Sequence, residues 1–173
     1  EGEMCGNGIR CVGKFVYDHG LTDQTTVRVE TLAGVKILRL QVEGGQVVSA
    51  TVDMGLPVPQ EPRTLQIMGR PYQARPVSMG NPHAVVFLDQ IDALDLPAIG
   101  PAFENHPSFP NRTNTEFVEV LDDTHLKMRV WERGSGETLA CGTGACATLV
   151  AAALAGKAGR KATVHLLGGD LSV

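Results

Sequence analysis

Apolar residues recur at helical spacing near the start of the chain. They are Ile9, Val12, Phe15 and Val16. Spacings of three and four residues place these side chains along one stripe of a helix, and Gly20 is a residue that commonly ends one. The pattern predicts an amphipathic helix over 9–19.

A second helix is predicted after Cys141. The longest run without charge, 139–156, approaches the length of a membrane span. Its start is rich in Cys, Gly and Thr, however, and the rest is mostly Ala. A buried central helix explains this composition better than a bilayer does.

Most of the remaining chain alternates between apolar and polar positions and is rich in β-branched residues, which predicts strands. The predicted strands are 27–31, 35–42, 47–54, 70–77, 84–88, 115–120, 125–131 and 161–167. A short helix is predicted over 97–105, and loops over 56–62 and 106–112. The chain therefore belongs to the α/β classes, as a mostly β, α+β protein with two prominent helices.

Composition narrows the functional classes. The 173 residues are 43% hydrophobic and 20% charged, which is typical of a soluble globular protein. The formal net charge is −4 and no basic cluster occurs, so a nucleic acid is not an expected partner. The first residues show neither an initiator Met nor a basic-then-apolar signal, and a cytoplasmic location with reduced thiols is expected.

Four cysteines are present, enough in number for two disulfides or a four-cysteine zinc site. Their spacing fits neither structure well, and no metal is expected. Cys11 and Cys146 fall inside the predicted helices, where we expect them to be packing residues.

Cys5 and Cys141 begin the same short pattern, C-G-x-G, and each pattern precedes a predicted helix. This repeat predicts two related lobes. The boundary is placed near Gly44–Gly45, which gives 1–45 as the C-terminal part of a first lobe and 46–173 as a second. The first helix begins almost at residue 1 and the last strand reaches Val173, so we expect a piece of a longer polypeptide, with the first lobe truncated and the second lacking its last strands.

The repeated pattern has a chemical meaning. A helix start offers unpaired N–H groups and partial positive charge, which favour a thiolate and can lower a cysteine pKa below its usual value of about 8.5. The glycines let backbone N–H groups approach an anion such as a carboxylate. One such motif is more often structural than catalytic. Two motifs, one per lobe, favour a pair of thiols that exchange protons on opposite faces of one carbon.

Several longer motifs closely resemble the diaminopimelate epimerase family, in that family's order and near its spacings, over nearly the whole chain. They are Glu3-Met4-Cys5-Gly6-Asn7-Gly8-Ile9-Arg10-Cys11, Gly80-Asn81-Pro82-His83, Asn114-Thr115-Glu116-Phe117, Glu132-Arg133-Gly134-Ser135-Gly136-Glu137-Thr138 and Ala140-Cys141-Gly142-Thr143-Gly144-Ala145.

The resemblance implies two pseudo-symmetric lobes, each a mixed β-sheet curled around a central helix. It implies an isomerase that converts LL- to meso-2,6-diaminopimelate without a cofactor, toward lysine and peptidoglycan precursors. Its partner would be this small-molecule substrate, with no nucleic acid and no membrane, and the family suggests a homodimer. Nearby alternatives are proline or hydroxyproline racemases and phenazine-biosynthesis-like isomerases, and a more distant one is a non-catalytic metal or redox module.

The resemblance also implies roles for individual residues. Cys5 and Cys141 would be the acid/base pair, and His83 and Glu132 would tune the thiols. The expected substrate-binding residues are Gly6, Asn7, Asn81, Asn114, Glu132, Arg133, Gly142 and Thr143.

Taken alone, several of these residues have simpler explanations. Asn81 before Pro82 is an ordinary turn residue, Asn114 could merely open a strand, and the adjacent charges of Glu132 and Arg133 could be solvated. Three other acids are expected to be surface charges. They are Glu104, Asp122 and Asp123.

Overall fold

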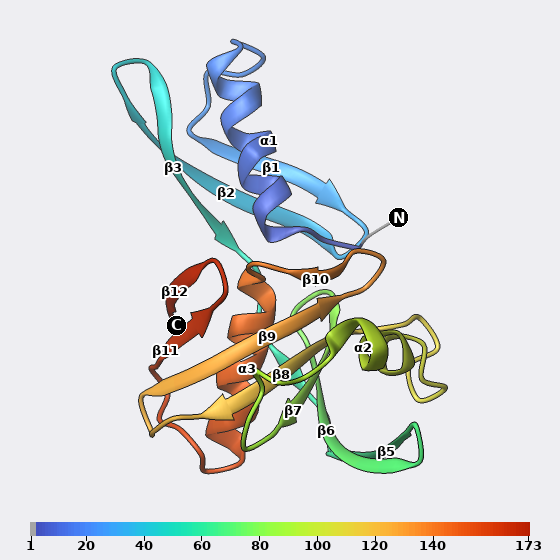
Figure 1. The fold of residues 1–173 in the computed structure, drawn as a ribbon. Helices are drawn as coiled ribbons and strands as arrows, with labels where there is room; N and C mark the ends of the chain where they lie inside the picture. Colours follow the sequence, from blue (N-terminus) through green and yellow to red (C-terminus); the bar gives the residue numbers. More distant parts are fainter. Residues whose placement is uncertain (1–2) are drawn as a thin grey trace. The chain divides into compact units, whose positions relative to one another are not determined.

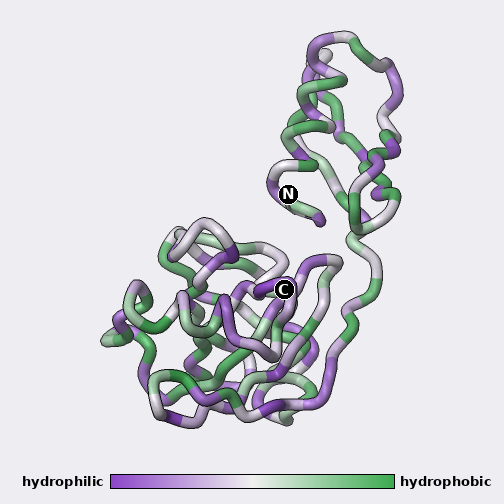
Figure 2. Tube along the Cα trace, turned by 90° about the vertical axis from the view of Figure 1, so that its right-hand side faces the viewer, coloured by the Kyte–Doolittle hydropathy of each residue, from purple (hydrophilic) through white to green (hydrophobic). Residues whose placement is uncertain are grey.

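The computed structural model describes residues 3–173, and the chain forms two compact units, 1–56 and 57–173 (Figure 1). Hydrophobic and hydrophilic residues are interleaved along the trace of both units (Figure 2). This interleaving reflects the alternation of side chains between the two faces of a strand.

The first unit is one helix on a small antiparallel sheet. Its elements are α1 (Gly6–Asp18), β1 (Thr26–Thr31), β2 (Gly34–Glu43) and β3 (Gln46–Asp53), with the strands in the order β1-β2-β3. Helix α1 packs against β2 and β3 over a core that includes Ile9, Leu38 and Leu40. The approach is close, because a Cβ on Gly13 would lie 2.6 Å from Leu38 Cδ2.

The division between the units lies later in the chain than the sequence predicts. Strand β3, expected to open the second lobe, pairs with β2 through partners such as Leu38 and Val52. The compact units therefore divide between Leu56 and Pro57 rather than after residue 45. The physical reason is that hydrogen bonds along the whole of β3 hold it in the first sheet.

The second unit contains one large mixed sheet. Its strands are β4 (Val58–Pro59), β5 (Arg63–Ile67), β6 (Arg70–Ser78), β7 (Pro82–Phe87), β8 (Asn114–Val120), β9 (His125–Glu132), β10 (Gly136–Thr138), β11 (Thr163–Leu166) and β12 (Gly169–Ser172). The order is β12-β11-β9-β8-β7-β6-β4, with β10 paired to β9 and β5 paired to β6. The β7/β8 and β9/β11 pairs are parallel and the other pairs are antiparallel.

Two helices cover the two faces of this sheet. Helix α3 (Gly142–Leu154) packs on one face with Val85 and Val118, while α2 (Leu96–Glu104) packs on the other with Val86 and Phe117 (Figure 1). The α2 face is tight, because a Cβ on Gly100 would meet the Trp131 ring at 2.2 Å.

The period of two along a strand determines which polar residues share the α3 face. Val85, Val118 and Val130 belong to the cluster around α3. Residues an even number of positions away along the same strands lie on the same face. They are His83 on β7, Asn114 and Glu116 on β8, and Glu132 on β9.

The α+β class and the three predicted helices are confirmed, and the predicted strands match observed strands within about two residues at most ends. The second sheet is mixed as expected, whereas the three strands of the first unit are antiparallel. The short strands β4, β5, β10 and β12 were not predicted. Within residues 3–173, no helix combines the length and apolar character needed to cross a membrane.

The predicted apolar stripe of α1 is only partly buried. Ile9 is 5% exposed, but Val12 and Phe15 are 45% and 54% exposed. In the described structure, β2 and β3 cover the side of the helix that carries Ile9 and Gly13, and the rest of the stripe remains open.

Candidate active site

The two C-G-x-G motifs form the same local structure. Cys5 is the N-cap of α1 with φ −130° and ψ 110°, and Cys141 is the N-cap of α3 with φ −137° and ψ 106°. In each case the thiol sulfur accepts a hydrogen bond from the backbone N–H three residues on, from Gly8 or Gly144, at 3.3 Å. Each sulfur thus takes the place of the capping oxygen that usually satisfies a free N–H at a helix start.

The last glycine of each motif allows this close approach. A Cβ on Gly8 would lie 3.2 Å from Cys5 Sγ, and a Cβ on Gly144 would lie 3.1 Å from Cys141 Sγ. The second site is tighter still, because the Gly144 Cβ would also lie 2.7 Å from Glu116 Oε1. The sequence therefore requires glycine where the sulfur and a carboxylate both meet the helix.

The two thiols differ in environment, since Cys5 is exposed and Cys141 is 6% exposed. Burial raises the pKa of Cys141 to about 12, and the nearby carboxylates of Glu116 and Glu132 add to the rise. The Thr143 hydroxyl and the Gly144 N–H oppose it. The predicted lowering of the thiol pKa is wrong for Cys141, because desolvation outweighs the helix start.

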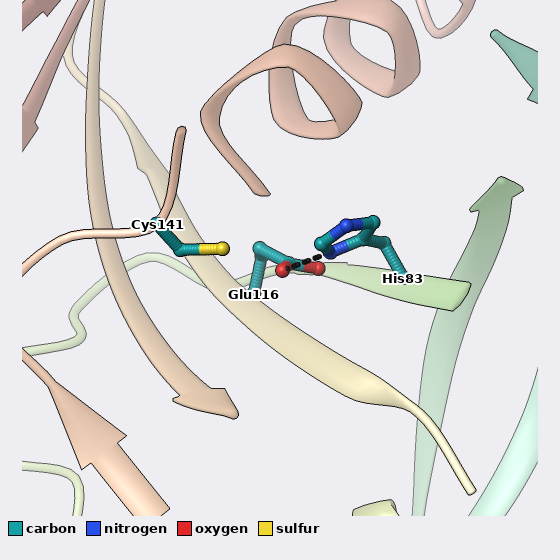
Figure 3. A group of neighbouring side chains, drawn as sticks. All are labelled: His83, Glu116 and Cys141. Atoms are coloured by element: carbon teal, nitrogen blue, oxygen red, sulfur yellow. Dashed lines mark hydrogen bonds and ion pairs between the residues drawn. The ribbon is translucent and has the colours of Figure 1, made fainter. Parts of the chain in front are cut away.

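Four further side chains connect to Cys141 within the second unit. Cys141 Sγ lies 3.6 Å from Thr143 Oγ1, which accepts from Asn81 Nδ2 at 3.3 Å. Asn81 Oδ1 lies 3.1 Å from His83 Nε2, and His83 Nδ1 lies 2.6 Å from Glu116 Oε1. The Cys141 sulfur points toward Glu116, which in turn bonds the imidazole (Figure 3). Three residues predicted for the site, Asn81, His83 and Thr143, are thus joined to Cys141.

Glu116 is a part of this site to which the sequence reasoning assigned no role. Its side chain is fully buried, and its Oε2 has no hydrogen-bond partner among the described residues. Its spacing was one available signal, since Glu116 lies two residues after Asn114 and so on the same face of β8, but only the structure shows that the run 114–118 is buried. A charged residue in such a run is rarely left without a function or a partner.

Asn114 and Arg133 are also brought together. Asn114 Oδ1 accepts from the Arg133 backbone N–H at 2.8 Å, and Asn114 Nδ2 donates to Pro82 O at 2.9 Å. Arg133 Nη1 donates to Asn111 O at 2.9 Å. Asn114 therefore joins the start of β7 to the start of the loop that carries Arg133.

Glu132, at the end of β9, is half-buried and accepts from the Thr138 hydroxyl. Its carboxylate contributes to the raised pKa of Cys141. It opposes a thiolate at Cys141 less strongly than Glu116 does, and its predicted tuning of both thiols stays a prediction.

The prediction that Glu104 is a surface charge is wrong. Glu104 is 6% exposed, and its Oε1 accepts from Arg112 Nη1 and from the Gly134 N–H, both at 2.9 Å. Its Oε2 accepts from Trp131 Nε1 at 2.8 Å. Glu104 therefore fixes both ends of the segment that contains Arg133. Asp122 and Asp123 are exposed, as predicted.

In the first unit, the predicted binding residues form the first turn of α1. Asn7 Oδ1 accepts from Arg10 Nη2, and Gly6 O accepts from Arg10 Nε at 3.3 Å. Arg10 thus places a positive charge beside the turn that follows Cys5.

The two remaining cysteines behave differently. Cys146 is half-buried against the α3 cluster, as predicted, and burial raises its pKa. Cys11 is exposed, so its predicted packing role is wrong. It lies on the side of α1 that the described sheet does not cover. All four cysteines are free thiols.

One group of side chains offers metal-ligand chemistry. His83, Glu116 and Cys141 present one nitrogen, one oxygen and one sulfur within 4.8 Å of one another. His83 Nδ1 and Glu116 Oε1 already bond each other, so a metal held by these two atoms would have to displace the proton between them.

Comparison with known proteins identifies the family of the chain. The model of the family described as diaminopimelate epimerase matches residues 1–59 and 76–173. The chain belongs to the diaminopimelate epimerase family. A diaminopimelate epimerase of Desulfovibrio desulfuricans is 55% identical over the whole chain, which covers 67% of that relative, and one of Phocaeicola vulgatus is 54% identical and 66% covered. The chain thus spans about two thirds of the length of these relatives.

Solved structures share the fold of this family at low identity. A probable proline racemase from Agrobacterium radiobacter has a TM-score of 0.75 at 17% identity, over 99% of this chain and 59% of that one. A hydroxyproline epimerase from Agrobacterium vitis has a TM-score of 0.73 at 17% identity, over 99% and 58%. These similarities concern the fold alone.

Proposed function

We propose that this protein is a diaminopimelate epimerase that converts LL- to meso-2,6-diaminopimelate by a two-thiol mechanism. The observation that carries the proposal is the matched pair of cysteine N-caps, in which Cys5 and Cys141 each accept an N–H bond at 3.3 Å. Membership of the family supports the substrate.

The chemistry requires one thiol at each face of the substrate α-carbon. One sulfur, as thiolate, removes the α-proton, and the other, as thiol, delivers a proton to the opposite face. The raised pKa of Cys141 favours its thiol form, which suits it to deliver the proton in this direction. Cys5 then removes the first proton in this direction, and the two cysteines exchange roles in the reverse direction. One sulfur takes a proton and the other gives one, and backbone N–H donors stabilise the carbanionic transition state, so the proposed mechanism uses no cofactor.

The first turns of the two helices stabilise the carbanionic transition state. Backbone N–H groups at Gly6, Asn7, Gly142 and Thr143 have no partner in their own helix at these positions and would bind the reacting carboxylate. Donors aimed at developing charge in a site without water are among the largest contributions to such catalysis.

The remaining residues recognise the rest of the substrate. Arg133 would bind the distal carboxylate, for which its planar fork is suited. Asn81 and Asn114 lie on the same side of the sheet and would bind polar groups of the substrate, with Glu132 near the α-amino group. The reaction would serve lysine and peptidoglycan precursors in the cytoplasm, in an enzyme that forms a homodimer.

The test compares C5A and C141A in the full chain. Both variants are expected to lose epimerisation by several orders of magnitude, measured as formation of meso-diaminopimelate from the LL isomer. C11A is the matched control and should retain activity, because Cys11 is exposed and lies outside the N-cap. Undiminished epimerisation in either N-cap variant would contradict the mechanism, and turnover of proline in place of diaminopimelate would contradict the substrate.

A further inference from the structure

A continuous chain of side chains leads from Cys141 to Glu116 inside the second unit. It passes through Thr143, Asn81 and His83, with heavy-atom separations of 3.6, 3.3, 3.1 and 2.6 Å in that order. The residues come from the start of α3, the turn before β7, β7 itself and β8. His83 and Glu116 are buried and Cys141 nearly so, so protein contacts rather than water determine the protons at this end of the chain.

The chain is satisfied when Cys141 is a thiolate. Thr143 then donates its hydroxyl proton to the sulfur and accepts from Asn81 Nδ2, as the amide is oriented here. The Asn81 oxygen accepts from His83 Nε2–H, and His83 Nδ1–H donates to the Glu116 carboxylate. Every contact has one donor and one acceptor, and His83 is an imidazolium.

The chain is equally satisfied when Cys141 is a thiol. The sulfur then donates to Thr143, and the hydroxyl donates to the Asn81 oxygen after a half-turn of the amide about its terminal bond. The Asn81 amino group donates to the bare Nε2 of a neutral His83. His83 Nδ1–H still donates to Glu116, so this bond is the one that does not reverse.

We propose that Thr143 and Asn81 couple the protonation states of Cys141 and His83. In this proposal Glu116 is a positioning residue that keeps a proton on His83 Nδ1, so that Nε2 alone gains a proton when Cys141 loses one. The two forms are thiolate with imidazolium and thiol with neutral imidazole. They hold the same number of protons, so the coupling needs no additional donor or acceptor.

The charges around Cys141 explain why this coupling matters. The carboxylates that face the sulfur, Glu116 on β8 and Glu132 on β9, both oppose a thiolate. A proton gained by His83 on β7 places a positive charge beside Glu116 as the negative charge forms on sulfur. A mixed state with a thiolate and a neutral His83 would instead set the Asn81 oxygen against the bare Nε2, which is a contact between two acceptors.

The first experiment measures alkylation of Cys141 in the full chain by iodoacetamide at pH 8, with no substrate, by mass spectrometry of the peptide that carries it. Thr143→Val keeps the side-chain shape but removes the hydroxyl, and the rate is expected to fall about tenfold, as for a lost bond to an ionised group. Thr143→Ser, the matched control, keeps the hydroxyl and should stay near the original rate.

His83→Gln is expected to slow Cys141 alkylation to a similar extent, and the T143V/H83Q double variant should be little slower than either single variant. Two independent effects would instead multiply to about a hundredfold. A multiplicative loss, or an unchanged rate in T143V, overturns the coupling. Because no substrate is present, these outcomes are separate from the epimerase test.

The second experiment is ¹⁵N NMR of the histidines at neutral pH, with His83 assigned by its loss in H83Q. Nδ1 of His83 should carry a proton in the unmodified chain, and in E116L the proton should move to Nε2. A bare Nδ1 in the unmodified chain, or an unchanged tautomer in E116L, overturns the positioning role of Glu116.

Discussion

His83 Nδ1 and Glu116 Oε1 lie 2.6 Å apart, and neither side chain is exposed to solvent. Their meeting follows from the sheet register, because β7 and β8 are parallel and His83 is paired with Asn114. Glu116 lies two residues farther along β8 and therefore on the same face as His83. The parallel pairing places a buried carboxylate beside both the imidazole and the start of α3.

Glu116→Gln is expected to lower the pKa of Cys141. The Glu116 carboxylate opposes formation of the thiolate, and the amide removes this charge while its oxygen can still accept from His83 Nδ1–H. The pH profile of Cys141 alkylation should therefore move to lower pH, by about one unit for a loss of about 1.4 kcal/mol of repulsion. Glu119→Gln, on the same strand, is the control and should leave the profile in place. A shift to higher pH in E116Q would contradict the electrostatic role of Glu116.

Cys141 should also make the protein less stable at alkaline pH. Its pKa is about 12 in the folded state against an ordinary value of 9.0. The folded state therefore keeps a proton that the unfolded state releases, so this contribution is complete below pH 9 and is lost as the pH rises toward 12. Over that window the free energy of unfolding should fall by up to about 4 kcal/mol more in the unmodified chain than in C141A. Denaturant titrations at several pH values measure this free energy. If it had the same pH dependence in both proteins, the burial of the thiol would be contradicted. C11A should keep the pH dependence of the unmodified chain.

Gly144→Ala is expected to destabilise the second unit. The added Cβ would lie 2.7 Å from Glu116 Oε1 and 3.1 Å from Cys141 Sγ, so the start of α3 must shift. Overpacking of this kind costs about 1–3 kcal/mol. Gly142→Ala is the matched control, because its Cβ meets nothing within 4 Å and Ala favours a helix more than Gly does. Thermal unfolding should show G144A below, and G142A at or above, the unmodified chain.

Much of the fold could be predicted from the sequence because the signals were local. The stripe around Ile9 and the alternation in 125–131 each depend on neighbouring residues, and both gave the right element. The division at Leu56 could not be read this way, because it depends on the pairing of β3 with β2. The open side of Val12 and Phe15 likewise depends on which strands cover the helix.

Part of the candidate site was also predictable, because its signals lie within a few adjacent residues. The part that depends on contacts between distant residues was not. The two N-caps follow from four adjacent residues each, and their repetition drew attention to Cys5 and Cys141. Glu104 and Glu116 were missed because a carboxylate in a sequence carries no local sign of burial. Each is buried by partners from other strands or loops, such as Trp131 for Glu104 and His83 for Glu116.

The four cysteines should differ in reactivity in the order of their exposure. Cys5 and Cys11 are exposed, Cys146 is half-buried and Cys141 is buried. Burial raises the pKa of the last two, which lowers their thiolate fraction at neutral pH. Limited alkylation at pH 7 followed by peptide mass spectrometry should find Cys5 and Cys11 modified first, and all four modified in denaturant. Early modification of Cys141 would contradict its environment.

Glu104 offers a final prediction, because its three bonds fix the segment around Arg133. Replacing it by Ala leaves Trp131 Nε1 and the Gly134 N–H without their acceptor. Both donors are only partly buried, so each lost bond costs about 1 kcal/mol and E104A should lower the free energy of unfolding by about 2 kcal/mol. Trp131 is the only tryptophan in the sequence, and its fluorescence should change in E104A as the indole loses its partner.

The control is Asp123→Ala, which removes an exposed acid and should alter the free energy of unfolding by less than about 0.5 kcal/mol. Equal stability of E104A and D123A would show that Glu104 behaves as a surface charge after all.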